Sequence, residues 1–460
     1  MKFKKLIALI CILGLTMTSA YAIQDKKASE MAVEYTNDVH SVFSLNDCIN
    51  IAIEKNPDIR ASIFNEKVYK SQIGQAWANY FPTISAGLDF SRSGNQYSHS
   101  GDKPFIYANT YTSMGYIPTV SADMLLFDFG KTKASADMAK NLYKASQEDT
   151  KENINTIIYD IKSAYFNILF AQAQIKVYED TVLDYEFQLN QAWSFYKLGK
   201  KAKIDVVTAD YNLGKAKLNL VKAKNVLEVA LTKLSRIMGI PEYTNYELSD
   251  ELLLNSFDIT SEKALEMAMA VRPELISAEK SAKAAKMKLR AKRRDFTPNL
   301  GIYGSYDNGI GNDYNLRSAK IGASISYSSF NILRTAKRIS QAKAEYERSL
   351  AELDSTKHTV YYNVKKAYID LQTNKEAIII AKLALDQAKE QYRQVTGRYK
   401  AGVGTAIELK DGENTYLNAR LDFYNSVLNY DLSFANLEKE IGVPLKFSDE
   451  LIIELSKDEI

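Results

Sequence analysis

The sequence predicts a mainly α-helical protein with membrane β-strands, built from a duplicated unit of helix, two strands and a helical hairpin. Two observations predict this fold class. Residues 43–241 and 259–444 carry the same short motifs in the same order, which indicates a tandem repeat. In both halves, short segments with period-two alternation precede very long segments with a period near 3.5. The matching positions are Pro57 and Pro273, Pro82 and Pro298, Phe127 and Phe330, Tyr165 and Tyr368, Gly199 and Gly402, and Pro241 and Pro444.

The N-terminus predicts export. Residues 1–22 have the form of a secretory signal peptide, in which lysines precede an apolar run and Ala20-Tyr21-Ala22 supplies a cleavage site. The apolar run is too short to span a bilayer as a helix, and no lipid anchor is expected because Cys11 lies inside it. Cleavage would leave Cys48 as the only cysteine, so the mature chain could form no internal disulfide. It would also remove three lysines, which cancels the formal net charge of +3.

Residues that carry chemistry are scarce in this chain, so neither an enzyme nor a cofactor is predicted. His40, His99 and His358 are far apart and show no paired spacing typical of metal ligands. Cys48 has no context typical of a nucleophile, and no glycine-rich phosphate loop is present. The basic stretch at 283–294 could suggest nucleic acid, but in an exported chain a solvated face with lysine stems near lipid headgroups is favoured.

Long helices account for most of each half. Residues 131–196 contain neither proline nor glycine, and apolar residues recur there at alternating steps of three and four. This pattern predicts a helix about 100 Å long, at about 1.5 Å per residue, that supercoils around partner helices. A second stripe returns over 204–234, and the second half repeats both features over about 335–394 and 407–441. Both returning helices end in glycine followed closely by proline, which favours a helix stop.

Four strands are predicted, at about 83–92, 119–127, 299–307 and 320–328, because apolar side chains alternate there with small polar ones. Strands of about ten residues with one apolar face are typical of outer-membrane barrels. The residues between them, 93–118 and 308–315, are predicted to be loops. Aromatic residues flank these strands, where they would lie at the lipid boundary or else close the ends of a soluble sheet. They are Phe81, Phe127, Phe129, Phe296 and Phe330.

Four strands are too few to close a barrel, and an open strand edge is not tolerated in lipid. Several copies of the chain must therefore combine their strands, and three copies would supply twelve.

The chain is predicted to divide into a signal peptide and two repeats, each repeat followed by an acidic segment. The connector and the tail share the motif Ser-Asp-Glu-Leu, so we expect them to pack beside the helices as an equatorial belt. The segments are the signal peptide 1–22, the first repeat 23–241, the acidic connector 242–258, the second repeat 259–444 and the C-terminal tail 445–460.

Several short motifs carry a resemblance to a known family. They are Asn56-Pro57, the Phe81-Pro82 and Thr297-Pro298 junctions, the segment Leu-Phe-Asp-Phe-Gly at 126–130, and the turns Tyr196-x-x-Gly199 and Tyr399-x-x-Gly402. In this order and duplication, the chain resembles the TolC-like outer-membrane efflux family over essentially its whole mature length. The resemblance implies a homotrimer whose twelve-stranded β-barrel lies in the outer membrane of a Gram-negative-type cell, in contact with its lipid. The barrel would continue into a long α-helical, coiled-coil tunnel through the periplasm.

The resemblance also implies a function. The chain would be the outer-membrane exit duct of a tripartite efflux or type I secretion system, conducting substrates passively. Its partners would be a periplasmic adaptor and an inner-membrane pump of the RND, ABC or MFS type, with no nucleic acid. The alternative is a structural coiled-coil protein of the cell envelope, whose alternating segments form ordinary sheets.

Such a duct would narrow at its periplasmic entrance. In the family, acids at the positions of Glu408 and Asp411 line this entrance, and the two lie three apart on one helix face. Three copies would place six carboxylates in a ring that favours cations. The alternative is an ordinary solvated helix face.

The resemblance places two further functions at the helical turns. It implies a closed-state contact between Asp205 and Tyr399. An arginine of the family is replaced here by Gly404, with Lys201 at the equivalent position of the first half. The turn tips would dock the adaptor, or serve only as hairpin turns in which glycine adopts a left-handed conformation. They are marked by Gly199, Ala202, Gly402 and Thr405.

Overall fold

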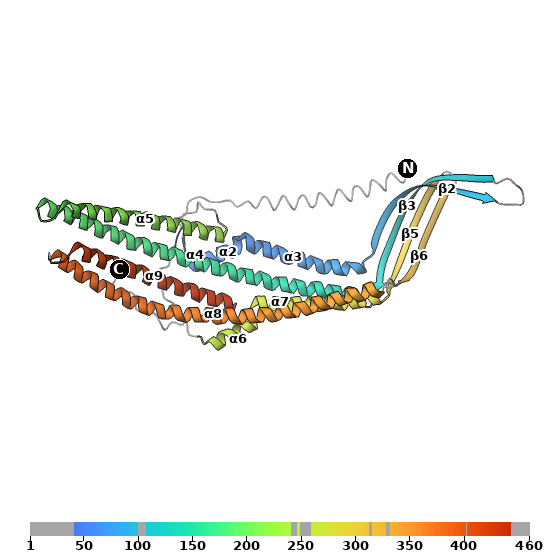
Figure 1. Ribbon diagram of the computed structural model, residues 1–460. Coiled ribbons are helices and arrows are strands. Elements are labelled where there is room, and N and C mark those ends of the chain that lie inside the picture. The colour runs from blue at the N-terminus through green and yellow to red at the C-terminus, as the bar shows by residue number, and fades with distance from the viewer. Residues whose placement is uncertain are drawn as a thin grey trace.

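The protein is a long, bowed bundle of helices with a β-sheet at one end, as the computed structural model shows (Figure 1). The structure describes residues 41–99, 107–240, 246–248, 259–311, 315–327, 332–401 and 403–442. The predicted signal peptide, most of the acidic connector and the C-terminal tail lie outside these residues. Within them, no helix combines the length and apolar character that a membrane crossing requires.

Each half contains two short helices and a long helical hairpin. The long helices α4 (Lys131–Lys197) and α8 (Ile332–Lys400) have 67 and 69 residues, and each reaches about 100 Å at about 1.5 Å per residue. The other helices are α2 (Leu45–Lys55), α3 (Pro57–Trp77), α5 (Lys203–Met238), α6 (Ser261–Val271), α7 (Pro273–Arg293) and α9 (Ala406–Ile441), with the 3-10 turns η1 (Ala78–Tyr80) and η2 (Arg294–Phe296).

The duplication is also visible in side-chain contacts at the start of α3 and α7. The Asn56 side chain donates to the Ile237 carbonyl at 2.7 Å, and Arg272 donates to the Glu440 carbonyl at 2.8 Å. Each accepting carbonyl lies two residues before the left-handed glycine that ends the returning helix, Gly239 or Gly442. The two halves therefore fasten the same helix end with different side chains.

The core of each half uses equivalent positions of the repeat. In the first half Ile161, Ile168, Leu234 and Met238 are fully buried together. Their counterparts in the second half form the other main cluster. These counterparts are Val364, Leu371, Leu437 and Ile441. The halves meet through a largely buried ion pair between Lys162 of α4 and Glu438 of α9.

The membrane-type strands form one antiparallel sheet in the order β2-β3-β5-β6. Among the described residues, this order leaves β2 and β6 as the two free edges of the sheet. The bounds are β2 (Thr83–His99), β3 (Tyr107–Phe127), β5 (Asn299–Gly311) and β6 (Asn315–Ser326).

The prediction of loops at 93–118 and 308–315 was wrong in length, because strands occupy most of both segments. Pairing of β2 with β3 continues from Thr83↔Asp123 to His99↔Tyr107 without a break. Pairing of β5 with β6 likewise continues to Ile310↔Asn315. The tyrosines and threonines of 107–112 favour extended backbone, so the ladder continues where apolar alternation has ended.

A second, small sheet anchors part of the acidic connector. Strands β1 (Ser41–Phe43) and β4 (Tyr246–Leu248) pair in parallel. The Tyr246 hydroxyl donates to the Leu231 carbonyl of α5 at 2.8 Å, which holds β4 against the helices. The rest of the predicted equatorial belt, formed by the acidic connector and the C-terminal tail, lies outside the described residues and stays a prediction.

Candidate functional site: the hairpin tips and the buried cluster behind them

The two helical hairpins end close together at the opposite end of the molecule from the sheet (Figure 1). In the first hairpin, left-handed Gly199 (φ 68°) reverses the chain, and Ala202 precedes α5 without a side-chain cap. In the second, Thr405 accepts from the Glu408 N–H at 3.1 Å and caps α9. Three of the four predicted tip residues therefore lie at these turns, and Gly402 is outside the described residues.

Glu408 and Asp411 lie in the first two turns of α9, and both are exposed. The Glu408 carboxylate accepts from the Thr405 N–H at 3.4 Å and lies 3.8 Å from Arg398 Nη2. It therefore helps to start the helix as one half of a capping box. The carboxylate of Asp411 has no hydrogen-bond or ion-pair partner among the described residues. Its place in an entrance ring stays a prediction.

The Tyr399 hydroxyl accepts a hydrogen bond from Lys201 in this conformation. Lys201 Nζ donates to Tyr399 Oη at 2.7 Å and lies 4.2 Å from the centre of its ring. Across the described part of the chain, no hydrogen bond joins Asp205 to Tyr399, so that predicted contact stays a prediction. Lys201 thus ties the first hairpin to the second.

The backbone around Gly404 is too crowded for a larger side chain, which explains why no arginine occupies this position. A Cβ there would lie 2.9 Å from the Tyr399 backbone nitrogen and 3.1 Å from the Arg398 carbonyl carbon. Such distances are shorter than van der Waals contact, so this backbone has no room for an arginine. The cation beside Tyr399 comes instead from the equivalent position of the first half, Lys201.

A buried carboxylate that the sequence did not single out lies two residues beyond Asp411. Glu413 is 4 % exposed, between α9 and α4. Gln188 Nε2 donates to it at 3.1 Å, and the Tyr185 hydroxyl also bonds it. Burial, with a smaller contribution from nearby Asp184, raises the pKa of Glu413 from its ordinary value of 4.5 to about 7. One carboxylate oxygen of Glu413 is buried without a hydrogen-bond partner among the described residues.

Asp184 and Tyr392 extend this cluster toward α8. Tyr392 Oη donates to Asp184 Oδ2 at 3.4 Å, and burial raises the pKa of Asp184. The sequence signal for the cluster was a carboxylate in an apolar stripe. Glu413 stands between Leu409 and Tyr416 in the alternating steps of four and three that continue along α9 to its buried core.

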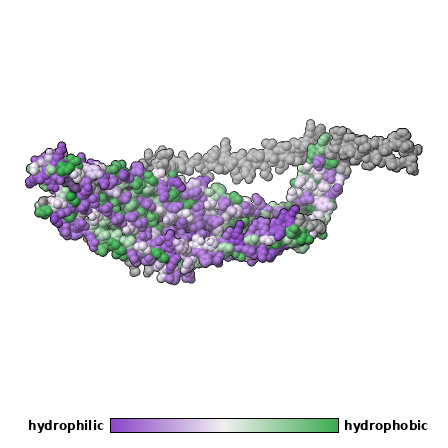
Figure 2. Space-filling view, in the orientation of Figure 1, coloured by the Kyte–Doolittle hydropathy of each residue, from purple (hydrophilic) through white to green (hydrophobic). Residues whose placement is uncertain are grey.

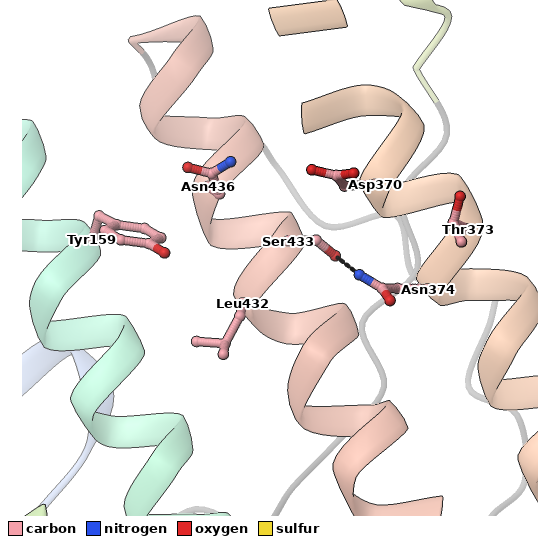
Figure 3. A pocket seen from close by; sticks show the side chains of 7 residues that line it. All are labelled: Tyr159, Asp370, Thr373, Asn374, Leu432, Ser433 and Asn436. Atoms are coloured by element: carbon pink, nitrogen blue, oxygen red, sulfur yellow. Dashed lines mark hydrogen bonds between the residues drawn. The ribbon is translucent and has the colours of Figure 1, made fainter. Parts of the chain in front are cut away.

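A polar hollow of about 310 Å³ lies farther along the bundle, among α4, α8 and α9 (Figure 3). Asn374 Nδ2 donates to Ser433 Oγ across its wall at 3.2 Å. Asp370 is the one acid among its lining residues, so the hollow lacks a convergent set of catalytic groups. Nor does the described part of the chain bring three His, Cys, Asp or Glu side chains together as a metal site would need. The lining residues are Tyr159, Asp370, Thr373, Asn374, Leu432, Ser433 and Asn436.

Comparison with known proteins identifies the family. The family model described as "Outer membrane efflux protein" matches residues 48–240 and again 264–443. The chain belongs to the outer membrane efflux protein family. The two matches correspond to the two halves, and the predicted resemblance to the TolC-like family is confirmed.

Relatives and solved structures agree with this membership. The chain is 24 % identical to the alkaline protease secretion protein AprF of Pseudomonas aeruginosa over 412 residues, 87 % of this chain and 84 % of the relative. It is 24 % identical to the outer membrane protein TolC of Escherichia coli over 418 residues, 84 % and 80 % of the two chains. The CmeC outer membrane channel of Campylobacter jejuni has a similar structure, with a TM-score of 0.74, 17 % identity, and coverage of 89 % and 90 %.

Family membership decides between an exit duct and a structural coiled-coil protein of the cell envelope, the two functions that the sequence left open. The chain is an outer-membrane exit duct for efflux or secretion, and is a channel rather than an enzyme. The sheet belongs to the outer-membrane end, and the helices extend into the periplasm. The hairpin tips are then the periplasmic end of the duct.

Proposed function

We propose that three copies of this chain form the duct, each contributing four strands to a twelve-stranded barrel. The single observation that carries this proposal is the open sheet, whose edges β2 and β6 pair with no other strand in the part of the chain that the structure describes. An unpaired edge in lipid would leave backbone N–H and C=O groups without partners, at a cost of several kcal/mol each. Joining β6 of one copy to β2 of the next satisfies every edge and closes the barrel.

The long helices support the same assembly. Apolar residues recur along α5 at steps of three, four and seven, and more than half of each of these side chains is exposed in the single chain. A heptad stripe of this kind packs against neighbouring helices in coiled coils. A second copy would therefore cover the α5 stripe and continue the helical tunnel. The residues are Ile204, Val207, Tyr211, Leu218 and Val221.

The periplasmic entrance would be narrowed by Glu408 and Asp411. Both are exposed near the start of α9, and three copies would bring six carboxylates around one axis. Such a ring attracts cations, as acidic rings in other channels do. The carboxylate of Asp411, which lacks a partner in the described residues, would contribute most of this field.

The entrance would be held shut by contacts between the two hairpins. Lys201 bonds Tyr399 in the present conformation. Asp205 lies in the first turn of α5, four residues after Lys201, and would be the alternative partner of Tyr399 when the hairpins shift. The tips themselves would dock a periplasmic adaptor, which connects the duct to an inner-membrane pump that supplies the energy.

Single-channel conductance tests this proposal. Purified protein in a planar bilayer should give small, cation-selective openings, and the Glu408→Ala/Asp411→Ala variant should lose much of that selectivity. A Glu347→Ala/Glu352→Ala variant is the matched control, because both of these exposed acids lie on α8, far from the tips. Selectivity that survives the tip variant, or falls equally in the control, would contradict the acidic ring. A well-folded sample that never conducts and stays monomeric would contradict the duct.

A further inference from the structure

The helices directly below the sheet carry a dense positive charge. Every charged residue of 281–294, the end of α7, is lysine or arginine, and the same holds for 332–344 at the start of α8. Helix α4 also begins with Lys131 and Lys133. We call residues 131–133, 288–294 and 334–338 the basic belt. Figure 2 shows this part of the bundle as a continuous hydrophilic surface, with hydrophobic residues gathered again where the sheet begins.

Acidic side chains neutralise only part of the basic belt. Asp295 lies 2.6 Å from Lys131, and Glu345 lies 2.7 Å from Lys288. Five other exposed cations of the basic belt form no ion pair with any described residue. These are Lys133, Arg290, Arg293, Lys337 and Arg338.

Helix stability does not explain this placement. The positive ends of the α4 and α8 dipoles lie at the sheet, and neither first turn contains an acid. At α4 the buried Asp128 carboxylate accepts from the Gly130 and Thr132 N–H groups, which compensates part of the dipole. Cations at a helix N-terminus are unfavourable, so Lys131, Lys133 and Arg334 stand where acids would stabilise the helix. A departure from a local rule of this kind is expected where a surface has a function. Negative charge from outside the chain would compensate it.

The position of the basic belt indicates the source of that charge. Phe127 ends β3 only four residues before Lys131, and Phe81, Phe127 and Phe129 are about half-exposed or more at this boundary. Exposed aromatic residues at the ends of membrane strands mark the lipid interface. The headgroup layer is about 5–8 Å thick on each side, and a helix rises about 1.5 Å per residue. The first turn of each helix therefore lies among headgroups, and the remaining belt lies within about one Debye length.

We propose that the basic belt binds anionic phospholipid headgroups of the periplasmic leaflet. The proposal rests on the sheet being the membrane barrel of the proposed duct. Arginine forks bind phosphate in two-point contacts, and lysine stems lie along apolar surface while their ammonium groups reach the headgroups. Binding would fix the height of the barrel in the membrane and enrich anionic lipid around it.

Tryptophan fluorescence provides a local test. The chain has two tryptophans, and Trp77, at the end of α3 beside the sheet, is exposed enough to meet lipid. In a Trp193→Phe background, quenching by brominated phosphatidylglycerol is compared with quenching by brominated phosphatidylcholine in reconstituted vesicles. We expect the parent to favour the anionic lipid by at least about fivefold, since one basic residue near a surface contributes roughly that factor.

Charge-neutral variants locate the preference. Arg293→Gln/Lys337→Gln/Arg338→Gln should lower the ratio several-fold, because these cations are exposed and without ion pairs in the described residues. Lys215→Gln/Lys222→Gln/Lys233→Gln on α5 is the matched control and should leave the ratio unchanged. An unchanged ratio in the belt variant would overturn the proposal. A change in ion selectivity without a change in lipid preference would also overturn it and would place these cations in the lumen.

A salt titration of the parent needs no variant. The anionic preference should fall as salt rises from about 0.05 M to about 0.5 M, because screening weakens exposed charges. A preference that does not depend on salt would overturn the proposal. Conductance and oligomeric state of the same sample separate the two hypotheses. Channels without lipid preference contradict only the basic belt, and a monomer that never conducts contradicts the duct.

Discussion

Replacing Glu413 by glutamine should stabilise the helical bundle at alkaline pH and leave it nearly unchanged at acidic pH. The pKa of Glu413 rises from 4.5 to about 7 because the side chain is buried between α4 and α9. The folded bundle therefore prefers the neutral carboxylic acid. Its contribution to stability is complete below the unfolded value of 4.5 and is lost as pH rises through about 7. Glutamine keeps a neutral group of the same shape at every pH.

The magnitude follows from the pKa difference. A shift from 4.5 to about 7, at about 1.4 kcal/mol per unit, corresponds to about 3 kcal/mol between the two protonation states. Burial of Glu413 sets most of this pKa shift, and the groups that face the side chain modify it. Gln188 and Tyr185 of α4 donate hydrogen bonds that favour the charged form, and Asp184 of the same helix opposes it. Tyr392 of α8 lies next to this group and donates to Asp184.

Denaturant unfolding measured by circular dichroism checks this prediction. The free energy of unfolding is measured for the parent and for Glu413→Gln between about pH 5 and about pH 8, and the difference is plotted against pH. Taking the difference removes the contribution of other titrating groups. We expect this difference in the free energy of unfolding to rise with pH toward about 3 kcal/mol in favour of the variant. Glu376→Gln, an exposed acid on α8, is the control and should give a flat line. A flat or falling curve for Glu413→Gln would refute the reasoning.

Two other contacts between the halves give predictions of defined sign. Lys201→Met removes the cation from Tyr399, and because a hydrogen bond from a charged group contributes about 1.5–3 kcal/mol, the open fraction in single-channel records should rise about tenfold or more. Lys200→Met, its exposed neighbour, should not change that fraction, and an equal rise in both would refute the contact. Lys162→Met leaves the Glu438 carboxylate buried without that cation and should lower the free energy of unfolding by about 3–5 kcal/mol. The repeat equivalent Lys365→Met, at an exposed site, should cost less than about 1 kcal/mol, and similar losses in both variants would contradict the buried pair.

The helices and the duplication could be predicted because they depend on local information. Residues 131–196 have no proline or glycine and keep a period near 3.5, and α4 begins at Lys131 as expected. The far ends of the strands could not be predicted in this way. Past residue 92 the extended backbone is stabilised by pairing with 107–115, a partner segment that apolar alternation does not mark.

The position of the hairpin tips could be predicted from the sequence, but the contacts between them could not. The tips follow from the glycine turns, yet Lys201 meets Tyr399 across 198 residues of sequence, and no local pattern encodes that meeting. The sequence showed that Gly404 stands where the family has an arginine. Only the close approach to Tyr399 explains why. Glu413 gave a readable signal, since a carboxylate at a buried position of a heptad is itself an exception to the pattern.

The contacts between the two hairpins join positions that are not equivalent in the repeat. Lys201 and Gly404 occupy equivalent positions, and the cation of the first bonds the tyrosine beside the second. Farther along, Asp180 of α4 accepts from Arg420 of α9 at 2.7 Å, and Lys162 of α4 pairs with Glu438 of α9. Each contact needs one charge on the first hairpin and its opposite, or an acceptor, on the second. The opposite charges are not repeated, since Ser235 stands at the position equivalent to Glu438 and Leu383 at the position equivalent to Asp180. Divergence after duplication therefore lets each contact form in one way only, which fixes the register of the two halves.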